Sequence, residues 1–153
     1  QLGLGQLQVD ENGCTEFNVL ISKDGKHGPT ADDYIRLNVK VRKHLEDILQ
    51  YLSTMYEIAV FTAGEMNYAD TILDFMDGDR VIIKHRLYRQ HCMQPAKGIY
   101  VKDIRVIADR DPKDIVLVDN SLVSFVKLQR NLKSSKKMPM TVRFVITNFN
   151  CLS

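Results

Sequence analysis

Residues 56–77, YEIAVFTAGEMNYADTILDFMD, set the fold class of this chain. Their first part, residues 58–62, is short, almost entirely apolar and bounded by turn residues, a pattern typical of a strand covered on both faces. Their second part, residues 67–76, spaces its apolar residues like one face of a helix. A buried strand that leads directly into a helix is the repeating unit of an α/β protein with a parallel sheet.

Upstream of this segment the sequence predicts a helix and a hairpin. Apolar residues recur at positions 45, 48, 49 and 52, the spacing of an amphipathic helix that ends near Met55. Two runs rich in β-branched and apolar residues, 19–21 and 34–41, flank a segment that contains glycine and proline. The flanking runs therefore predict a β-hairpin with a long loop.

Downstream, strand and helix alternate again. Residues 115–118, IVLV, predict a second buried strand, and residues 121–129 have a helical pattern with Ser121 at the N-cap position. Residues 140–149, MTVRFVITNF, alternate apolar and polar side chains and predict a strand at a sheet edge. The whole pattern predicts a central parallel sheet flanked by helices, in a single domain of residues 1–153. Because the chain begins with Gln1 and ends at Ser153 without a tryptophan, we expect the domain to be truncated at both ends.

Composition excludes some classes of protein but selects no function. A net charge of +2 is too small for a nucleic-acid-binding face, and the longest apolar runs are far shorter than the ~20 residues that cross a bilayer. Three cysteines without C-x-x-C spacing argue against a disulfide framework or a zinc site and favour a reducing compartment inside the cell. The sequence leaves the nucleus, the cytoplasm and the mitochondrion all open.

Four polar residues stand where a parallel sheet binds its ligands. Ligands of α/β sheets lie beyond the carboxyl ends of the strands, where Thr62 follows the first buried strand and Asp119 and Asn120 follow the second. Lys102 lies between them in the sequence. Each residue alone has a simpler interpretation, as a helix cap, a turn or a solvated lysine. Together they predict a site for phosphate and Mg²⁺, because Mg²⁺ binds carboxylate and phosphate oxygens.

Four blocks of sequence resemble the small C-terminal-domain phosphatases of RNA polymerase II, which belong to the haloacid dehalogenase superfamily. The blocks are YEIAVFTAGEMNYADTILDFMD, HRLYRQHC, GIYVKDI and DIVLVDNSLVSFV, in this order. The resemblance is specific over residues 56–126 and weaker over residues 2–55. It implies a haloacid-dehalogenase-like, Rossmannoid sheet with a β-hairpin inserted after the first strand.

The resemblance also implies a reaction. In this family two aspartates of a first strand, written D-x-D-x-T, transfer the phosphoryl group: one attacks phosphorus, and the other protonates the leaving oxygen and later activates water. By the same resemblance Thr62 would hold a phosphate oxygen and Lys102 would neutralise its charge. Asp119 and Asn120 would complete a magnesium site.

Residues 2–7, LGLGQL, stand where the D-x-D-x-T strand is expected, and Gly3 and Gly5 take the positions of the two aspartates. A residue without a side chain neither attacks phosphorus nor transfers a proton, so this placement predicts no catalytic residue and leaves the four polar residues above as vestiges. Two alternatives stay open for this stretch. Either the glycines let a backbone pass closely, or the true aspartates lie elsewhere.

The leading hypothesis is therefore a catalytically inactive phosphatase-like domain without a cofactor, which serves as a structural or protein-binding subunit of a larger assembly. The alternative is an active Mg²⁺-dependent protein serine/threonine phosphatase with an aspartyl-phosphate mechanism, whose catalytic aspartates are not located here. A third hypothesis is a sensor that binds phosphate or a phosphopeptide without hydrolysing it. All three imply a protein partner and no nucleic acid.

The remaining reactive side chains have ordinary interpretations. The four histidines lack metal-ligand spacing, so we expect surface or hydrogen-bonding roles for them, and Cys92 is expected to be a packed thiol. A basic cluster after the second buried strand predicts a solvated loop rather than a binding face. It comprises Arg130, Lys133, Lys136 and Lys137.

Overall fold

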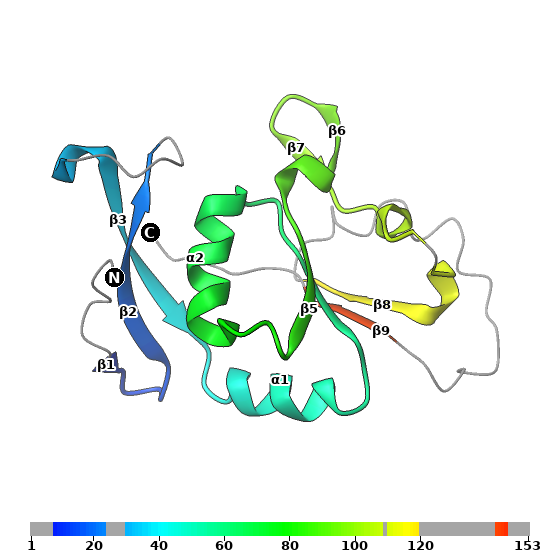
Figure 1. Cartoon of the computed structure of the whole chain (residues 1–153), viewed down its shortest axis with the longest axis horizontal. Coiled ribbons are helices and arrows are strands. Elements are labelled where there is room, and N and C mark those ends of the chain that lie inside the picture. Colours follow the sequence, from blue (N-terminus) through cyan, green and yellow to red (C-terminus); the bar gives the residue numbers. More distant parts are fainter. Residues whose placement is uncertain (1–7, 24–29, 109, 120–142, 147–153) are drawn as a thin grey trace.

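A parallel sheet with the strand order β5-β4-β9-β8 forms the centre of the molecule. The structure is a computed structural model that describes residues 8–23, 30–108, 110–119 and 143–146 (Figure 1). Every neighbouring pair in this sheet is parallel. The strands are β4 (Ile58–Phe61), β5 (Ile83–Leu87), β8 (Ile115–Val118) and β9 (Arg143–Ile146). The predicted α/β class is confirmed.

Strand β4 is covered on both faces, as its apolar sequence predicts. None of its side chains is more than 6% exposed. Ile58 and Val60 face the helices α1 (Leu45–Ser53) and α2 (Met66–Asp77), whereas Ala59 and Phe61 pack against Ile104 on the opposite face. Because side chains alternate along a strand, a run without polar residues fits only a strand buried on two sides.

Helices α1 and α2 begin and end close to their predicted limits. Leu45, Leu49 and Leu52 of α1 face the core, but Ile48 is 51% exposed, so including Ile48 in the apolar stripe was wrong. The stripe follows the helical period at i, i+4 and i+7, which places i+3 at its margin. In α2, Ile72 and Leu73 are fully buried.

A three-stranded antiparallel sheet, β1-β2-β3, packs against α2 on the side away from the central sheet (Figure 1). Its strands are β1 (Gln8–Val9), β2 (Thr15–Ser22) and β3 (Tyr34–Val41). The predicted hairpin is present, with Thr15 opposite Val41 and Ser22 opposite Tyr34. The rings of Phe17 in β2 and Phe75 in α2 stack with centroids 3.8 Å apart. This contact anchors the hairpin to the helix.

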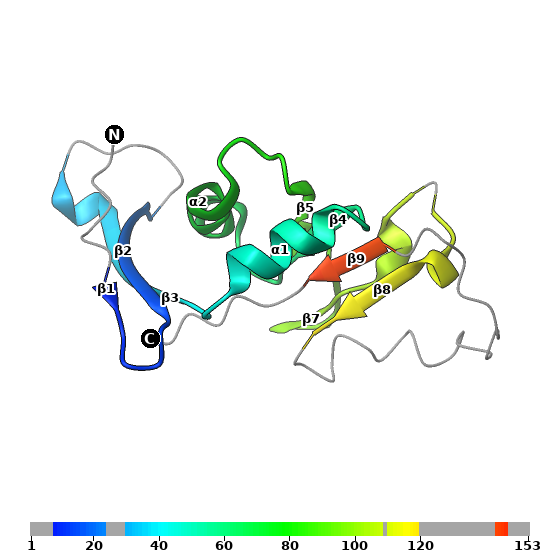
Figure 2. The same cartoon turned by 90° about the horizontal axis from the view of Figure 1, so that it is seen from below.

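Strand β9 lies inside the central sheet and not at its edge, so the predicted edge position was wrong. Ile146 of β9 lies opposite Val60 of β4 on one side and Val118 of β8 on the other. Figure 2 shows β8 and β9 at the end of the molecule far from the hairpin. An alternating pattern describes the two faces of a strand but does not say which strands pair with it.

Strand β8 has β9 as its one neighbour among the described strands, and Val118 is 46% exposed. The prediction of a fully buried second strand was therefore wrong for its last residue. The predicted central strand at residues 2–7, the predicted helix at residues 121–129 and the basic cluster lie outside the described residues. Neither α1 nor α2 has the length and hydropathy to span a bilayer, and the described ranges contain no other α-helix.

Candidate functional site

Thr62 and Asp119 lie at the same edge of the central sheet. Thr62 directly follows β4 and Asp119 directly follows β8, and both strands run parallel to β9 between them. Because all carboxyl ends of a parallel sheet meet at one edge, the two residues share the edge where α/β proteins bind ligands. Thr62 is buried. Asn120, Gly3 and Gly5 lie outside the described residues.

Lys102 reaches the same edge from another element. It directly follows β7 (Ile99–Val101), which pairs with β6 (Met93–Ala96) in a hairpin that projects from the sheet (Figure 1). Its Nζ donates a hydrogen bond to Oδ2 of Asp119 at 2.7 Å. The Lys102 side chain is 5% exposed and that of Asp119 is fully buried. We refer to Thr62, Lys102 and Asp119 together as the strand-end site.

The ion pair with Asp119 allows the charged ammonium group of Lys102 to be buried away from bulk water. Removing an ammonium and a carboxylate from water is costly, and their mutual attraction offsets this cost only while both are present. An ammonium group has three N–H donors, and the bond to Asp119 uses one of them. Lys102 is thus a buried cation with further donor capacity, a suitable partner for a phosphate oxygen.

Thr62 begins a short turn, residues 62–65, which we call the Thr62 loop. Its N–H donates to the carbonyl of Leu87 at 2.8 Å, and its hydroxyl oxygen accepts the N–H of Gly64 at 3.0 Å. Because the oxygen acts as acceptor there, the hydroxyl proton is available to another acceptor. A Cβ at Gly64 would lie 3.2 Å from both the Thr62 hydroxyl oxygen and the Tyr68 ring, so a side chain at this turn would be in tight contact.

The Thr62 loop is held from the side of β5. The Nε of Arg89 donates to the carbonyl of Ala63 at 2.8 Å, and the Arg89 N–H donates to the carbonyl of Gly64 at 3.0 Å. From the sequence, Arg89 is only one cation in a basic run. The parallel register that places Leu87 opposite Phe61 also brings Arg89 beside Ala63. Arg89 could have been identified only from this pairing of β4 with β5.

Cys92 contacts the backbone of Thr62, one residue of the strand-end site. Its Sγ is 3.8 Å from the carbonyl oxygen of Thr62 and 3.9 Å from that of Tyr88. Burial raises the pKa of the Cys92 thiol, and the smaller effects of the charges on Lys102 and Arg89 oppose it. A thiol with a raised pKa is protonated at neutral pH and is a poor nucleophile. These contacts agree with the interpretation of Cys92 as a packed thiol.

The described histidines have hydrogen-bonding partners. His85 Nε2 lies 2.6 Å from a carboxylate oxygen of Glu57, and His91 Nδ1 accepts the N–H of Tyr88 at 2.9 Å. In the part of the chain that the structure describes, no group of three or more His, Cys, Asp and Glu residues is placed to hold a metal. Mg²⁺ needs no such group, because it takes one or two carboxylates together with water and phosphate oxygens. The carboxylate of Asp119 fits this requirement.

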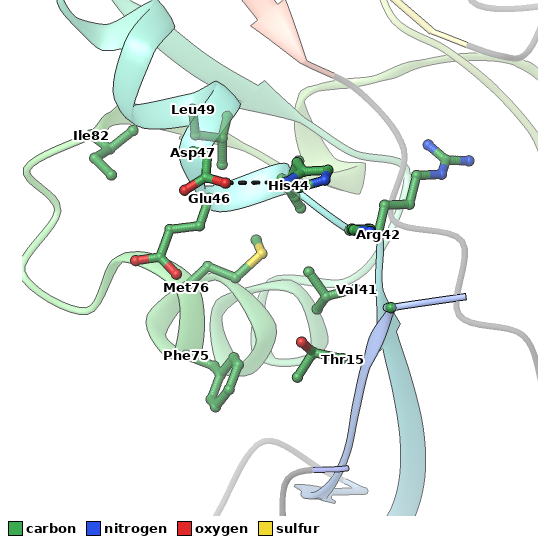
Figure 3. A pocket seen from close by; sticks show the side chains of 13 residues that line it. Thr15, Val41, Arg42, His44, Glu46, Asp47, Leu49, Phe75, Met76 and Ile82 are labelled. Carbon is green, nitrogen blue, oxygen red and sulfur yellow. Dashed lines mark hydrogen bonds and ion pairs between the residues drawn. The ribbon is translucent and has the colours of Figure 1, made fainter. Parts of the chain in front are cut away.

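A cavity of about 430 Å³ lies elsewhere, between the hairpin, the first turn of α1 and the last turns of α2 (Figure 3). Val41, Leu49 and Met76 line its apolar part. At its rim His44 Nδ1 lies 3.3 Å from a carboxylate oxygen of Asp47, the contact drawn as a dashed line in Figure 3. Thr62, Lys102 and Asp119 do not line this cavity. It is therefore separate from the strand-end site.

Comparison with known proteins identifies one family. The family model described as "NLI interacting factor-like phosphatase" matches residues 11–136. The matched range contains all three residues of the strand-end site, as well as Asn120. Gly3 and Gly5 precede it.

Curated relatives carry phosphatase names. The CTD nuclear envelope phosphatase 1B of Danio rerio is 39% identical over 87 residues, 57% of this chain and 35% of that protein. The probable C-terminal domain small phosphatase of Dictyostelium discoideum is 44% identical over 85 residues, 56% of this chain and 27% of that protein. The phosphatase PSR1 of Saccharomyces cerevisiae is 36% identical over 123 residues, 78% of this chain and 28% of that protein. The matches thus span about a third of each relative or less.

These comparisons overturn the leading hypothesis from the sequence. The expectation of an inactive domain rested on Gly3 and Gly5, which lie outside the described residues and outside the match to the family model. The relatives are named as phosphatases, and their names give no support to an inactive structural subunit. The prediction of a non-enzymatic domain was therefore wrong, and the findings favour the alternative, an active phosphatase.

Proposed function

Since the chain belongs to the NLI interacting factor-like phosphatase family, we propose that it acts as a Mg²⁺-dependent protein serine/threonine phosphatase. The observation that carries this proposal is the buried pair of Lys102 and Asp119 at the carboxyl edge of the sheet, the edge at which the buried Thr62 also lies. A buried cation, a hydroxyl group and a carboxylate at one sheet edge meet the needs of a phosphate with its metal ion.

Lys102 and Thr62 bind the phosphate in this proposal. The Lys102 ammonium keeps its bond to Asp119 and donates a further N–H to a phosphate oxygen, where it neutralises the negative charge that develops during phosphoryl transfer. The Thr62 hydroxyl accepts the N–H of Gly64 and donates its own proton to a second phosphate oxygen. Both groups are buried, which strengthens their electrostatic effect because little water screens it.

Asp119 is the proposed protein ligand of Mg²⁺, and Asn120 is proposed beside it on the strength of the family resemblance. When bound, Mg²⁺ neutralises phosphate charge and orients the phosphoryl group. Asp119 has a second task in the absence of substrate, because it balances the charge of Lys102. The attacking carboxylate is none of these residues, and the catalytic aspartates of this reaction are not located here, because Gly3 and Gly5 stand where the resemblance expects them.

The proposed substrates are phosphoserine and phosphothreonine in proteins, so the proposed partner is a phosphoprotein. A carboxylate forms a bond to phosphorus while the bond from phosphorus to the serine or threonine oxygen breaks, and that oxygen takes up a proton. Water then attacks the phosphorus of the aspartyl phosphate and releases inorganic phosphate. The overall reaction consumes one water and yields the free hydroxyl amino acid.

The experiment is phosphate release from a phosphoserine peptide and from an aryl phosphate, with Mg²⁺ and with a chelator. We expect turnover that requires Mg²⁺ and falls by about 100-fold or more in Lys102→Met and in Thr62→Val. Asp119→Asn is expected to raise the Mg²⁺ concentration that half-maximal turnover requires. The matched control is Lys84→Met, since Lys84 is exposed on β5 and lies outside the strand-end site.

Two results would contradict the proposal. The first is a folded protein that releases no phosphate from either substrate at saturating Mg²⁺. The second is turnover that the Lys102 and Thr62 variants leave unchanged. A protein that binds inorganic phosphate through Lys102 but does not hydrolyse either substrate would be a phosphate sensor instead.

A further inference from the structure

Arg89 contacts every residue of the Thr62 loop except Thr62 itself. Its Nε donates to the carbonyl of Ala63 and its backbone N–H donates to the carbonyl of Gly64. A terminal guanidinium nitrogen lies 2.7 Å from a carboxylate oxygen of Glu65. Three consecutive residues are thus bound by one arginine from outside the loop.

The same guanidinium group also contacts the segment that carries Lys102. Its central carbon lies 5.0 Å from the centre of the Tyr100 ring, and Tyr100 is in β7, two residues before Lys102. A cation over an aromatic face within about 6 Å is attracted by the ring. Arg89 therefore connects the two segments that supply Thr62 and Lys102 to the strand-end site.

The position of Arg89 is itself fixed by its neighbours. It begins the short 3₁₀ helix η2 (Arg89–His91), in which the Tyr88 N–H donates to His91 Nδ1 and the His91 N–H donates to the carbonyl of Tyr88. The hydroxyl of Tyr88 donates to Asp70 in α2 at 2.6 Å. The backbone at Arg89 is thus connected through Tyr88 to α2, so the contacts of Arg89 link the Thr62 loop to that helix.

We propose that Arg89 is a positioning residue, which holds the Thr62 loop so that the Thr62 hydroxyl keeps its place at the carboxyl edge of the sheet. This inference rests on the proposed function, because it names a residue that acts on phosphoryl transfer through Thr62. A guanidinium group has its donors in a rigid plane, and here Nε and a terminal nitrogen reach two acceptors at once. A lysine ammonium is a point charge on a flexible stem and does not replace this geometry.

The test compares Arg89→Met and Arg89→Lys with Arg36→Met, a matched control in which an exposed arginine of β3 is lost. For each variant, kcat and KM are measured on an aryl phosphate and on a phosphoserine peptide. Hydrogen exchange is measured at the amides of residues 63–65, and the melting temperature is recorded. We expect kcat to fall by about 10- to 100-fold on both substrates in Arg89→Met, since a small displacement of a positioning group has an effect of this size. Arg89→Lys should restore little, and amide exchange in the loop should become faster.

Several outcomes would overturn the positioning role. A loss confined to the phosphopeptide would make Arg89 a contact for the peptide chain. Unchanged exchange in the Thr62 loop would show that Arg89 does not hold it. Full activity in Arg89→Lys would mean that charge alone suffices. If the unmodified protein hydrolyses neither substrate, the proposed function fails, and the exchange rates alone then decide whether Arg89 positions the loop.

Discussion

The ammonium of Lys102 lies 2.7 Å from the carboxylate of Asp119, and both side chains are almost completely buried. The two residues are 17 positions apart and follow different strands, β7 and β8. Their contact therefore joins the base of the β6–β7 hairpin to the edge of the central sheet. Because both partners are buried, the loss of either one should lower the stability of the fold as well as affect the proposed reaction.

The first prediction concerns this pair. Lys102→Met and Asp119→Leu should each lower the free energy of unfolding by about 3–5 kcal/mol, because each leaves an uncompensated charge in the interior. The double variant should be more stable than either single variant. Denaturant unfolding measures all three, and Asp47→Asn is the control because its contact with His44 is exposed and is worth about 1 kcal/mol or less. A single variant as stable as the parent would contradict the prediction.

The second prediction concerns Asp77, at the end of α2. Burial acts to raise the pKa of its carboxyl group, but hydrogen bonds from the N–H groups of Ile83, Ile82 and Val81 outweigh it, so the pKa lies below its ordinary value of 3.8. A lowered pKa gives stability that is present above the unfolded value and is lost as the pH falls through the folded value. We expect stability to drop below about pH 4, and to drop less in Asp77→Asn.

Asp77→Asn should also be less stable at neutral pH by about 1–3 kcal/mol, since an amide nitrogen replaces an acceptor for these N–H groups. Urea unfolding at a series of pH values measures both effects. Asp79→Asn is a neighbouring control. If the stability of Asp77→Asn and that of the parent depended on pH in the same way, the lowered pKa of Asp77 would not be the cause of the loss in acid.

The third prediction concerns Tyr88 in alkaline solution. Burial, together with the hydrogen bond and negative charge of Asp70, raises the pKa of Tyr88 to about 12. Between its ordinary value of 10 and this value, the unfolded chain loses the proton and the folded chain keeps it, so stability falls as the pH rises. An ultraviolet titration should show one tyrosine ionising near this pH, and Tyr88→Phe should abolish that step. If the ionisation step near this pH persisted in Tyr88→Phe, it would belong to another tyrosine.

The fourth prediction concerns the contact between the hairpin and α2. Phe17→Ala should lower the free energy of unfolding by about 3–5 kcal/mol, because it removes a fully buried ring that stacks on Phe75. Val9→Ala is the control, since Val9 is largely exposed, and should change stability by about 0.5 kcal/mol or less. Equal stability of the two variants, measured by thermal unfolding, would show that the hairpin does not contribute to the core.

Local sequence patterns were sufficient for the elements whose pattern arises within one segment. The apolar run of β4 follows from burial on both faces, and the stripe of α2 follows from the helical period. The positions of Thr62 and Asp119 were also predictable, because each directly follows a strand and parallel strands end at a common edge. The conclusion of inactivity was not justified, because it depended on placing residues 2–7 as a strand from a weak part of the resemblance.

The amino-acid sequence by itself determined the α/β class, the hairpin, the two helices and the polar residues at the strand ends, because side-chain periodicity and turn residues act over a few neighbouring positions. Only the tertiary structure decided that β9 lies between β4 and β8, that Lys102 pairs with Asp119, and that Arg89 donates a hydrogen bond to the Thr62 loop. Each of these depends on which strands pair and in what register. Register is a choice among distant segments, made by the energy of packing the whole sheet, and no single segment carries it.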